Sequence, residues 1–448
     1  MRLQNTFLAI ASYIFYGWWD YRFLILIFVS TVVDYLVALG MERYADQRSR
    51  KNLLGVSIVF NLGLLAYCKY ANFFIDSFVD AFLFAGFDID SPTLNIILPV
   101  GISFYTFQTL SYSIDVYRGE IKANKDFLAF MVYVSFFPQL VAGPIERSTK
   151  LLPQILNKRI FSYQEAALGM KQILWGLFKK MVIADNCAPY VDQIFNSSDS
   201  LHGSTLLLGA VLFSFQIYGD FSGYSDIAIG VSRLFGIKLS RNFNNPYFSR
   251  DIAEFWRKWH ISLSSWFKDY VYIPLGGSAK NKITSIKNIF IIFLISGFWH
   301  GANWTFIAWG AFHSLLYLPL FLLKRNRKNL SEHPRFKDLL PVLKTYLLVC
   351  IGWVFFRAKD ISQATDILSE IMSESLFSPI EVSLRVLYII ALILILIVLE
   401  WLNRTHEFTL EKLGNNWNMY TRWSFYSTIL LLIAWFAKTG TSFIYFQF

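Results

Sequence analysis

Charged residues are scarce in this sequence. Asp, Glu, Lys and Arg make up 16% of the 448 residues, whereas 55% of the residues are hydrophobic. A soluble globular domain carries about 25% charged residues. The composition therefore excludes a protein whose whole surface is exposed to water. Aromatic residues make up 18%, and such rings fill helix interfaces and gather at the membrane–water boundary. The composition therefore predicts a polytopic membrane protein.

Cysteine is also rare, and familiar catalytic motifs are absent. Cys68, Cys187 and Cys350 lie far apart, and no CxxC pair occurs. This spacing supports neither a disulfide framework nor a zinc site, so we predict no bound metal. The sequence contains no Walker, GxSxG, HExxH or GxGxxG pattern, which disfavours a nucleotide-driven pump and a serine hydrolase.

The only charge excess is positive, with 41 Lys and Arg against 31 Asp and Glu. No aromatic-and-basic pattern of a nucleic-acid module occurs, so we predict no nucleic-acid partner. Basic residues instead favour cytoplasmic loops next to membrane lipid. The predicted cytoplasmic loops are 41–51, 118–125, 145–160, 238–287, 324–337 and 403–422. The acidic loops 76–92, 185–203 and 357–382 are predicted to face outside.

Apolar runs recur along the whole chain, and several contain Gly or Pro. Irregular backbone at membrane depth is tolerated only where it is buried in protein or lines a cavity. We therefore predict an all-α polytopic membrane protein of roughly 10–12 transmembrane helices, each about 20 residues long, plus re-entrant helices around a central tunnel. The runs 127–144 and 288–323 each lie between two basic loops and should enter the membrane and return. No linker or repeat divides residues 1–448, so we predict a single domain.

Two histidines stand out because each directly follows a tryptophan. His300 falls inside an apolar run, where a titratable imidazole is costly unless it is paired or used. A neutral imidazole can take a proton from a hydroxyl and return it to a leaving group, as acyl transfer to an alcohol requires. The alternative is a structural histidine, held by a backbone carbonyl between packed helices.

His260 lies in a basic and aromatic segment, residues 250–270. Its apolar side chains follow the three- and four-residue spacing of a helix: Trp256, Trp259, Leu263, Trp266 and Phe267. This spacing predicts an amphipathic helix on the cytoplasmic surface that binds anionic lipid. The alternative is a re-entrant helix that brings His260 and basic side chains to the phosphate or thioester of a donor.

Two segments are unusually polar for membrane helices. In 216–230, Asp220 and Asp226 should pair with Arg or His or line a wet cavity. An Asp beside an imidazole would fix the tautomer of that imidazole. Segment 98–119 carries many hydroxyl and amide side chains, which either join helices to one another or line a polar tunnel.

These residues resemble the membrane-bound O-acyltransferase family, and within it the branch that O-acetylates alginate. The resemblance rests on SYIFYGWWD (12–20), LPVGISFYTFQTLSY (98–112), FFPQLVAGPIER (136–147), FQIYGDFSGYSDIAIG (215–230), FNNPYFSRDIAEFWRKWHISLSSWFKDYVYIPLGG (243–277), GFWHGANWTFIAWG (297–310) and WVFFRA (353–358). Family members usually carry a further hydrophobic stretch before the first of these segments. We therefore expect that this chain either starts late relative to them or lacks that span.

The resemblance implies an O-acetyltransferase in the bacterial inner membrane, with the active histidine at His300 and a second functional histidine at His260. It implies a cytoplasmic donor, acetyl-CoA or another acyl thioester, with no permanently bound cofactor. The acceptor would be an exported or cell-surface polysaccharide, and the partner a periplasmic SGNH-like acetyltransferase. The side chains predicted to line the substrate tunnel are Asp220, Gln216, Tyr218, Asn245, Trp256, Trp299 and Asn303.

Two other functions stay open on the sequence. The same fold could transfer D-alanine to teichoic acid, which would need a carrier protein as donor. A non-catalytic transporter of lipid or acyl carrier is the other alternative. Transporters commonly show two corresponding halves with paired broken helices, and the sequence shows no such symmetry.

Overall fold

The computed structural model describes residues 1–89, 94, 96–278, 281–330, 333–380, 383–438 and 443–444. Every regular element among these residues is a helix, so the all-α prediction is confirmed. Parts of four predicted loops, 90–92, 279–280, 331–332 and 381–382, lie outside the described residues.

Seven of the described helices are long and apolar enough to cross a membrane. They are Phe23–Arg43, Gln47–Phe84, Gly203–Leu234, Lys282–His300, Trp304–Leu322, Phe336–Arg357 and Leu384–Leu402. The protein is therefore a multi-pass membrane protein. The sequence estimate of roughly 10–12 spans also counted runs that form shorter helices, such as α5 (Ile102–Arg118) and α9 (Tyr163–Leu177).

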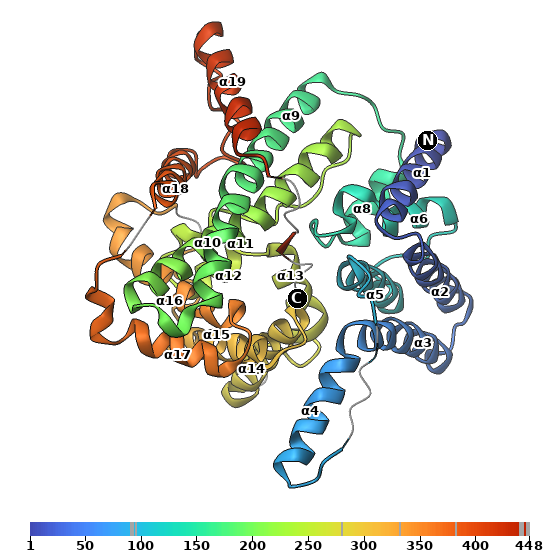
Figure 1. Cartoon of the computed structure of the whole chain (residues 1–448). Helices are drawn as coiled ribbons and strands as arrows, with labels where there is room; N and C mark the ends of the chain where they lie inside the picture. Colours follow the sequence, from blue (N-terminus) through green and yellow to red (C-terminus); the bar gives the residue numbers. More distant parts are fainter. Residues whose placement is uncertain are drawn as a thin grey trace. The chain divides into compact units, whose positions relative to one another are not determined.

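The chain folds into two compact units (Figure 1). The first unit comprises Met1–Tyr163 and Ser232–Ser240, and the second comprises Gln164–Val231 and Arg241–Phe448. Besides α5, the helices of the first unit are α1 (Arg2–Trp19), α2 (Phe23–Arg43), α3 (Gln47–Leu65), the π-helical turn η1 (Ala66–Tyr70), α4 (Ala71–Phe84), α6 (Phe127–Ser135), α7 (Phe137–Leu140) and α8 (Ser148–Leu156).

Helix α5 packs against α2 and α3 through polar side chains. The Ser113 hydroxyl donates to Asp34 Oδ1 at 2.8 Å, and the Asn61 amide donates to Asp34 Oδ2 at 2.8 Å. The Thr109 hydroxyl donates to Asn61 Oδ1 at 3.1 Å. In this part of segment 98–119, hydroxyl groups therefore join helices, as the first of the two sequence interpretations predicted.

The predicted break in 127–144 is also present. Helix α6 ends at Ser135, and α7 starts at Phe137 with Pro138 in its first turn. Proline is tolerated there because the N–H group that it lacks would have no partner within the helix. The Gln108 side chain donates to the Tyr133 carbonyl at 2.5 Å, which satisfies a backbone group near the break.

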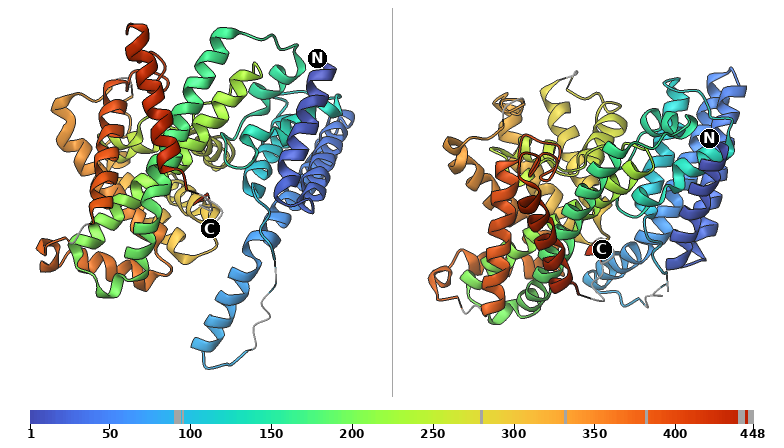
Figure 2. Two further views of the ribbon diagram at one scale, coloured as in Figure 1. Left: turned by 45° about the horizontal axis from the view of Figure 1, so that its top comes forward. Right: turned by 90° about the horizontal axis from the view of Figure 1, so that it is seen from above.

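The second unit contains the remaining helices, apart from Tyr163 at the start of α9 and the last residues of α11 (Figure 2). Besides α9, they are α10 (Asp185–Asn196), α11 (Gly203–Leu234), α12 (Ile252–Lys258), α13 (Ile261–Phe267), α14 (Lys282–His300), α15 (Trp304–Leu322), α16 (Leu339–Arg357), α17 (Ile361–Ile371), α18 (Leu384–Leu402) and α19 (Met419–Phe436). The short elements are the π-helical turns η2 (Phe178–Ala184) and η5 (Lys268–Tyr272), and the 3₁₀ turns η3 (Ser198–Ser200), η4 (Pro246–Phe248), η6 (Phe336–Asp338) and η7 (Glu374–Phe377).

Residues 203–234 form one continuous helix, α11. Its glycines mark a close helix contact instead of a break. A Cβ atom on Gly223 would lie 2.8 Å from the Gly176 carbonyl oxygen, and one on Gly219 would lie 2.8 Å from the Lys179 carbonyl oxygen. The backbones of α9 and η2 therefore approach α11 closely, as small residues allow in membrane helices.

Helices α14 and α15 form the hairpin that the sequence predicted over 288–323. His300 is the last residue of α14, and Gly301 is extended. The Asn303 side chain then accepts a hydrogen bond from the Thr305 N–H at 2.9 Å and caps α15. The hairpin therefore leaves His300 at its turn.

Candidate active site

The two histidines singled out by the sequence lie side by side in the second unit. Their ring centroids are 6.3 Å apart. His260 is 1% exposed and His300 is 3% exposed. The sequence predicted His260 on an amphipathic cytoplasmic helix or a re-entrant helix, and His300 inside a separate apolar run. The fold instead brings both imidazoles into one buried place.

The prediction of one amphipathic surface helix over 250–270 is wrong. Helix α12 ends at Lys258 and α13 begins at Ile261, with His260 between them in the left-handed backbone conformation. The apolar stripe is buried against protein, since the Trp259 ring lies 4.9 Å from Trp353 and 5.0 Å from Phe243. The helical spacing of the stripe carried no information about the break.

Aromatic rings surround both imidazoles. Phe221 packs in a T-shaped arrangement against His260 with the ring centroids 4.6 Å apart, whereas the ring centroids of Trp309 and Phe356 each lie 5.2 Å from that of His300. His260 lies outside the seven spanning helices, and burial lowers its pKa to about 3, because a low-dielectric site disfavours the charged form. The His260 imidazole is therefore neutral at neutral pH.

The basic side chains near His260 are engaged in ion pairs and hydrogen bonds with protein groups. Arg250 Nε lies 3.0 Å from Glu254 Oε2, and Lys258 Nζ lies 2.8 Å from Glu254 Oε1. Arg257 donates to the Asn326 carbonyl at 2.7 Å. These contacts hold α12 in place, and they give no support to the interpretation of these side chains as a phosphate site.

Both acids of segment 216–230 pair with lysines of η2 rather than with Arg or a histidine. Lys179 Nζ lies 2.6 Å from Asp226 Oδ2, and Lys180 Nζ lies 2.7 Å from Asp220 Oδ1. Asp220 also accepts the Ile444 N–H at 2.6 Å. The hypothesis that one of these acids orients a histidine is therefore wrong.

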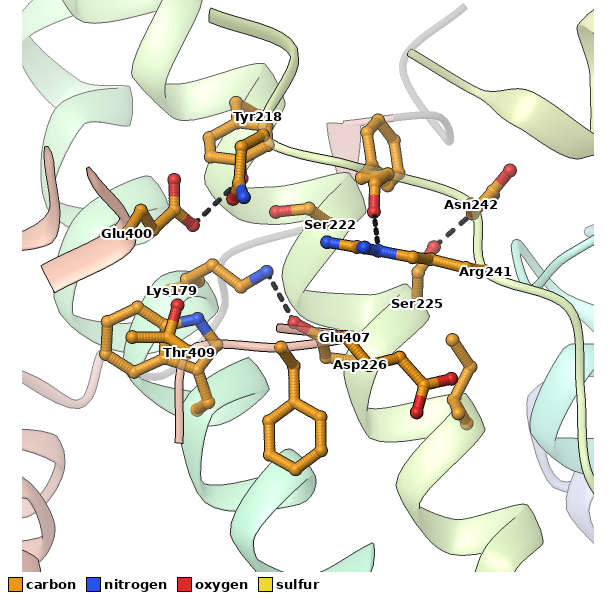
Figure 3. A pocket seen from close by; sticks show the side chains of 15 residues that line it. Lys179, Tyr218, Ser222, Ser225, Asp226, Arg241, Asn242, Glu400, Glu407 and Thr409 are labelled. Atoms are coloured by element: carbon orange, nitrogen blue, oxygen red, sulfur yellow. Dashed lines mark hydrogen bonds and ion pairs between the residues drawn. The ribbon is translucent and has the colours of Figure 1, made fainter. Parts of the chain in front are cut away.

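A polar cavity lies next to the segment that carries His260 (Figure 3). Tyr218 belongs to its wall, and the Tyr218 ring lies 6.3 Å from Trp259. The Tyr218 hydroxyl donates to Glu400 Oε1 at 2.8 Å, beside the Lys179–Asp226 pair. The lining residues are Trp175, Lys179, Tyr218, Ser222, Ser225, Asp226, Ile229, Arg241, Asn242, Phe243, Asn245, Glu400, Glu407, Phe408 and Thr409.

The predicted tunnel-lining residues fall into different places. Tyr218 and Asn245 line the polar cavity, whereas Gln216 and Asp220 are not part of its wall. Gln216 is 6% exposed, and its side-chain oxygen accepts no hydrogen bond from the described residues. The structure thus brings together only part of this predicted set.

The other three predicted residues lie near the α14–α15 turn or against α15. The Trp299 ring lies 5.0 Å from His300 and 5.8 Å from His260, inside the candidate site. The Trp256 ring packs 5.4 Å from Trp309. Asn303 is the cap of α15 and donates to the Lys359 carbonyl at 2.8 Å, so its observed role is structural.

Sequence reasoning missed Lys179, Glu400 and His313. Each is an ionisable residue inside an apolar run, which is the signal that drew attention to His300. His313 is fully buried, and its ring lies 4.9 Å from Trp309 and 5.0 Å from Trp256. Within the described ranges, no group of three or more His, Cys, Asp or Glu side chains could hold a metal ion.

The chain is similar to known membrane acyltransferases over most of its length. Residues 10–358 match the family model of the membrane-bound O-acyltransferase family, a range that includes both histidines. The chain is 41% identical over 365 residues to the probable alginate O-acetylase AlgI of Pseudomonas aeruginosa, a match that covers 81% of this chain and 68% of that protein.

Two relatives with other names are similar as well. The peptidoglycan O-acetyltransferase of Helicobacter pylori is 37% identical over 391 residues, which covers 81% of this chain and 73% of that protein. The teichoic acid D-alanyltransferase of Bacillus subtilis is 30% identical over 284 residues, which covers 60% of this chain and 71% of that protein.

Proposed function

Because the chain belongs to the membrane-bound O-acyltransferase family, we propose that it passes an acetyl group across the membrane to O-acetylate an exported or cell-surface polysaccharide. The chain is an acyltransferase, and relatives named as O-acetylases of alginate and peptidoglycan support membrane O-acetylation. In the proposal, acetyl-CoA or another cytoplasmic acyl thioester is the donor, and the acceptor is an alginate-type polysaccharide.

The observation that carries the proposal is the pair of buried imidazoles. His260 and His300 lie 6.3 Å apart between ring centroids, inside the matched region. A buried imidazole at the end of a membrane helix costs free energy unless it is paired or used. Proton transfer to and from a hydroxyl is a use that suits a neutral imidazole.

In the proposed reaction, His300 is the general base. Its imidazole takes the proton of the acceptor hydroxyl while the hydroxyl oxygen attacks the acetyl carbonyl carbon. The carbon–sulfur bond of the thioester then breaks, and the imidazolium returns the proton to the departing thiolate. A thioester and an alcohol give an ester and a thiol, and no further reactant is needed. His260 stays neutral and orients the donor.

The proposal places the chain in the bacterial inner membrane, surrounded by lipid. The resemblance implies a periplasmic SGNH-like acetyltransferase as the partner that receives or hands on the acetyl group. The acidic loops predicted to face outside, 185–203 and 357–382, are where such a partner would meet the chain.

The test is acetyl transfer by membrane vesicles that contain the chain, the partner and the polysaccharide, supplied with radiolabelled acetyl-CoA. His300→Ala should lower the rate by about 10²–10⁴-fold while the variant keeps the wild-type elution volume and melting temperature. His202→Ala is the matched control, because His202 is exposed. A folded His300→Ala variant with the wild-type rate would contradict the proposal.

Transfer of D-alanine to teichoic acid is the second candidate function. It is favoured by the similarity to the Bacillus subtilis teichoic acid D-alanyltransferase. The two functions differ in the donor, so acetyl-CoA and a D-alanyl-loaded carrier protein should be supplied in parallel. Transfer from the carrier protein alone would replace the acetyl proposal with this one.

A further inference from the structure

His260 has an unusual backbone conformation for its residue type. Its φ is 45° and its ψ is 55°, in the left-handed region that favours glycine. A residue with a Cβ atom keeps this conformation only where the surroundings impose it. His260 stands at the N-cap of α13, and its own side chain makes no capping hydrogen bond. Neighbouring groups must therefore hold this turn.

Asn242 supplies these contacts. It is fully buried, and its Oδ1 accepts hydrogen bonds from the Ser262 hydroxyl at 2.9 Å and from the Ser262 N–H at 3.3 Å. Its carbonyl accepts the Ile261 N–H at 2.9 Å. Both residues that follow His260 are therefore bound to one asparagine.

The same segment also holds the residues before His260. The Asn244 N–H donates to the Lys258 carbonyl at 2.9 Å. Residues 242–244 thus run beside residues 258–262 and bind them on both sides of Trp259 and His260. The break between α12 and α13 is set by this pairing rather than by a helix-breaking residue.

Asn242 is tied in turn to α11. Its Nδ2 donates to the Ser225 hydroxyl at 3.4 Å in the wall of the polar cavity (Figure 3). Helix α11 also carries Phe221, whose ring packs in a T-shaped arrangement against His260, with the ring centroids 4.6 Å apart. Helix α11 therefore supports His260 in two ways: Ser225 holds Asn242, which binds the backbone after His260, and Phe221 contacts the His260 ring.

We propose that Asn242 is a positioning residue, which holds the His260 imidazole beside His300 through its hydrogen bonds to Ile261 and Ser262. The proposal rests on the proposed function, because it gives His260 a part in acyl transfer. Displacement of a group by about 1 Å can slow a reaction by about 10²-fold. Loss of the Asn242 side-chain acceptor should therefore lower kcat rather than weaken donor binding.

The experiment compares Asn242→Leu with Asn242→Asp, which keeps the Oδ1 acceptor. Asn242→Leu should lower kcat for acetyl transfer by roughly 10- to 100-fold, with the KM for acetyl-CoA within about twofold of the wild-type value. Asn242→Asp should recover most of the rate. In a His260→Ala background, Asn242→Leu should cost no further activity, because residues that act as one unit are not additive.

Asn244→Leu is the matched control. The Asn244 side chain makes no hydrogen bond to the described residues, and the variant keeps the backbone bond to Lys258. It should retain the wild-type rate. Equal losses in Asn242→Leu and Asn242→Asp, or a full second loss in the His260→Ala background, would overturn the positioning role.

Hydrogen–deuterium exchange separates this inference from the proposed function. Asn242→Leu should speed exchange in a peptide that covers residues 259–266 and leave α14 unchanged, whatever reaction the protein catalyses. If exchange is faster in Asn242→Leu but the wild-type protein transfers no acetyl group, the proposed function is contradicted. The inference that Asn242 holds the turn at His260 then still stands. Unchanged exchange in residues 259–266 would remove the positioning role itself.

Discussion

At the scale of single residues, the second unit holds several charges away from water. Lys179 and Asp226 pair at 2.6 Å, with side-chain exposures of 4% and 15%. The Lys179 ammonium also lies 5.6 Å from the centre of the Tyr218 ring. A buried charge without its partner lowers the stability of the fold. The stability therefore depends on the pairing of these groups more than on their number.

Lys179→Met is therefore expected to destabilise the fold, because Asp226 would be left without its buried cation. The expected loss is on the order of 3–5 kcal/mol of unfolding free energy. It can be measured by denaturant titration in detergent with tryptophan fluorescence as the signal. The double variant Lys179→Met/Asp226→Asn should recover much of this loss. A single variant as stable as the wild type would show that solvent screens the pair.

At the scale of helices, close contacts between backbones decide which side chains meet. Gly223 of α11 and Gly176 of α9 face each other so closely that a Cβ on either would meet the other's carbonyl within 2.8 Å. This contact brings the η2 lysines to the α11 acids. Two helices separated by bulkier residues would not place them at ion-pair distance.

Gly223→Ala should lower the stability of the protein by about 1–3 kcal/mol, because the new methyl group meets backbone that cannot easily move. Gly55→Ala is the control, since a Cβ on Gly55 has nothing within 4 Å. Alanine should there stabilise α3 by up to about 1 kcal/mol. The test is the melting temperature of each variant, measured at one heating rate. It should fall for Gly223→Ala and rise for Gly55→Ala.

At the scale of the whole molecule, loop charge predicts the orientation of the chain in the membrane. The 185–203 loop contains no Lys or Arg and is predicted to face outside, whereas the basic 324–337 loop is predicted to face the cytoplasm. Ser200 and Lys328 are exposed in these loops. Cys187 and Cys350 are buried, which leaves Cys68 as the thiol to remove before labelling.

With Cys68 replaced by Ala, a membrane-impermeant maleimide should label Ser200→Cys in intact spheroplasts. Lys328→Cys should react only after the cells are lysed. The readout is the gel shift of the labelled protein. Labelling of Lys328→Cys in intact spheroplasts would contradict the predicted orientation. It would also contradict the proposed direction of acyl transfer.

Much of the candidate site was predictable because its signal is local. The cost of an imidazole in an apolar run depends only on neighbouring residues, and it singled out His300. The same rule, applied to every apolar run, would have found Lys179, Glu400 and His313. The break at His260 was not predictable in this way, because helical spacing continues through it and Asn242, from another segment, imposes it.

The sequence by itself determined the membrane class of the protein and its helical nature, and it singled out the two histidines as candidates. Hydropathy and helical spacing depend only on residues that are close along the chain. Only the tertiary structure decided that His260 lies 6.3 Å from His300, that Asp226 pairs with Lys179 and that Asn242 holds the turn. These contacts depend on how closely helices approach, which is set by packing between distant segments rather than by composition.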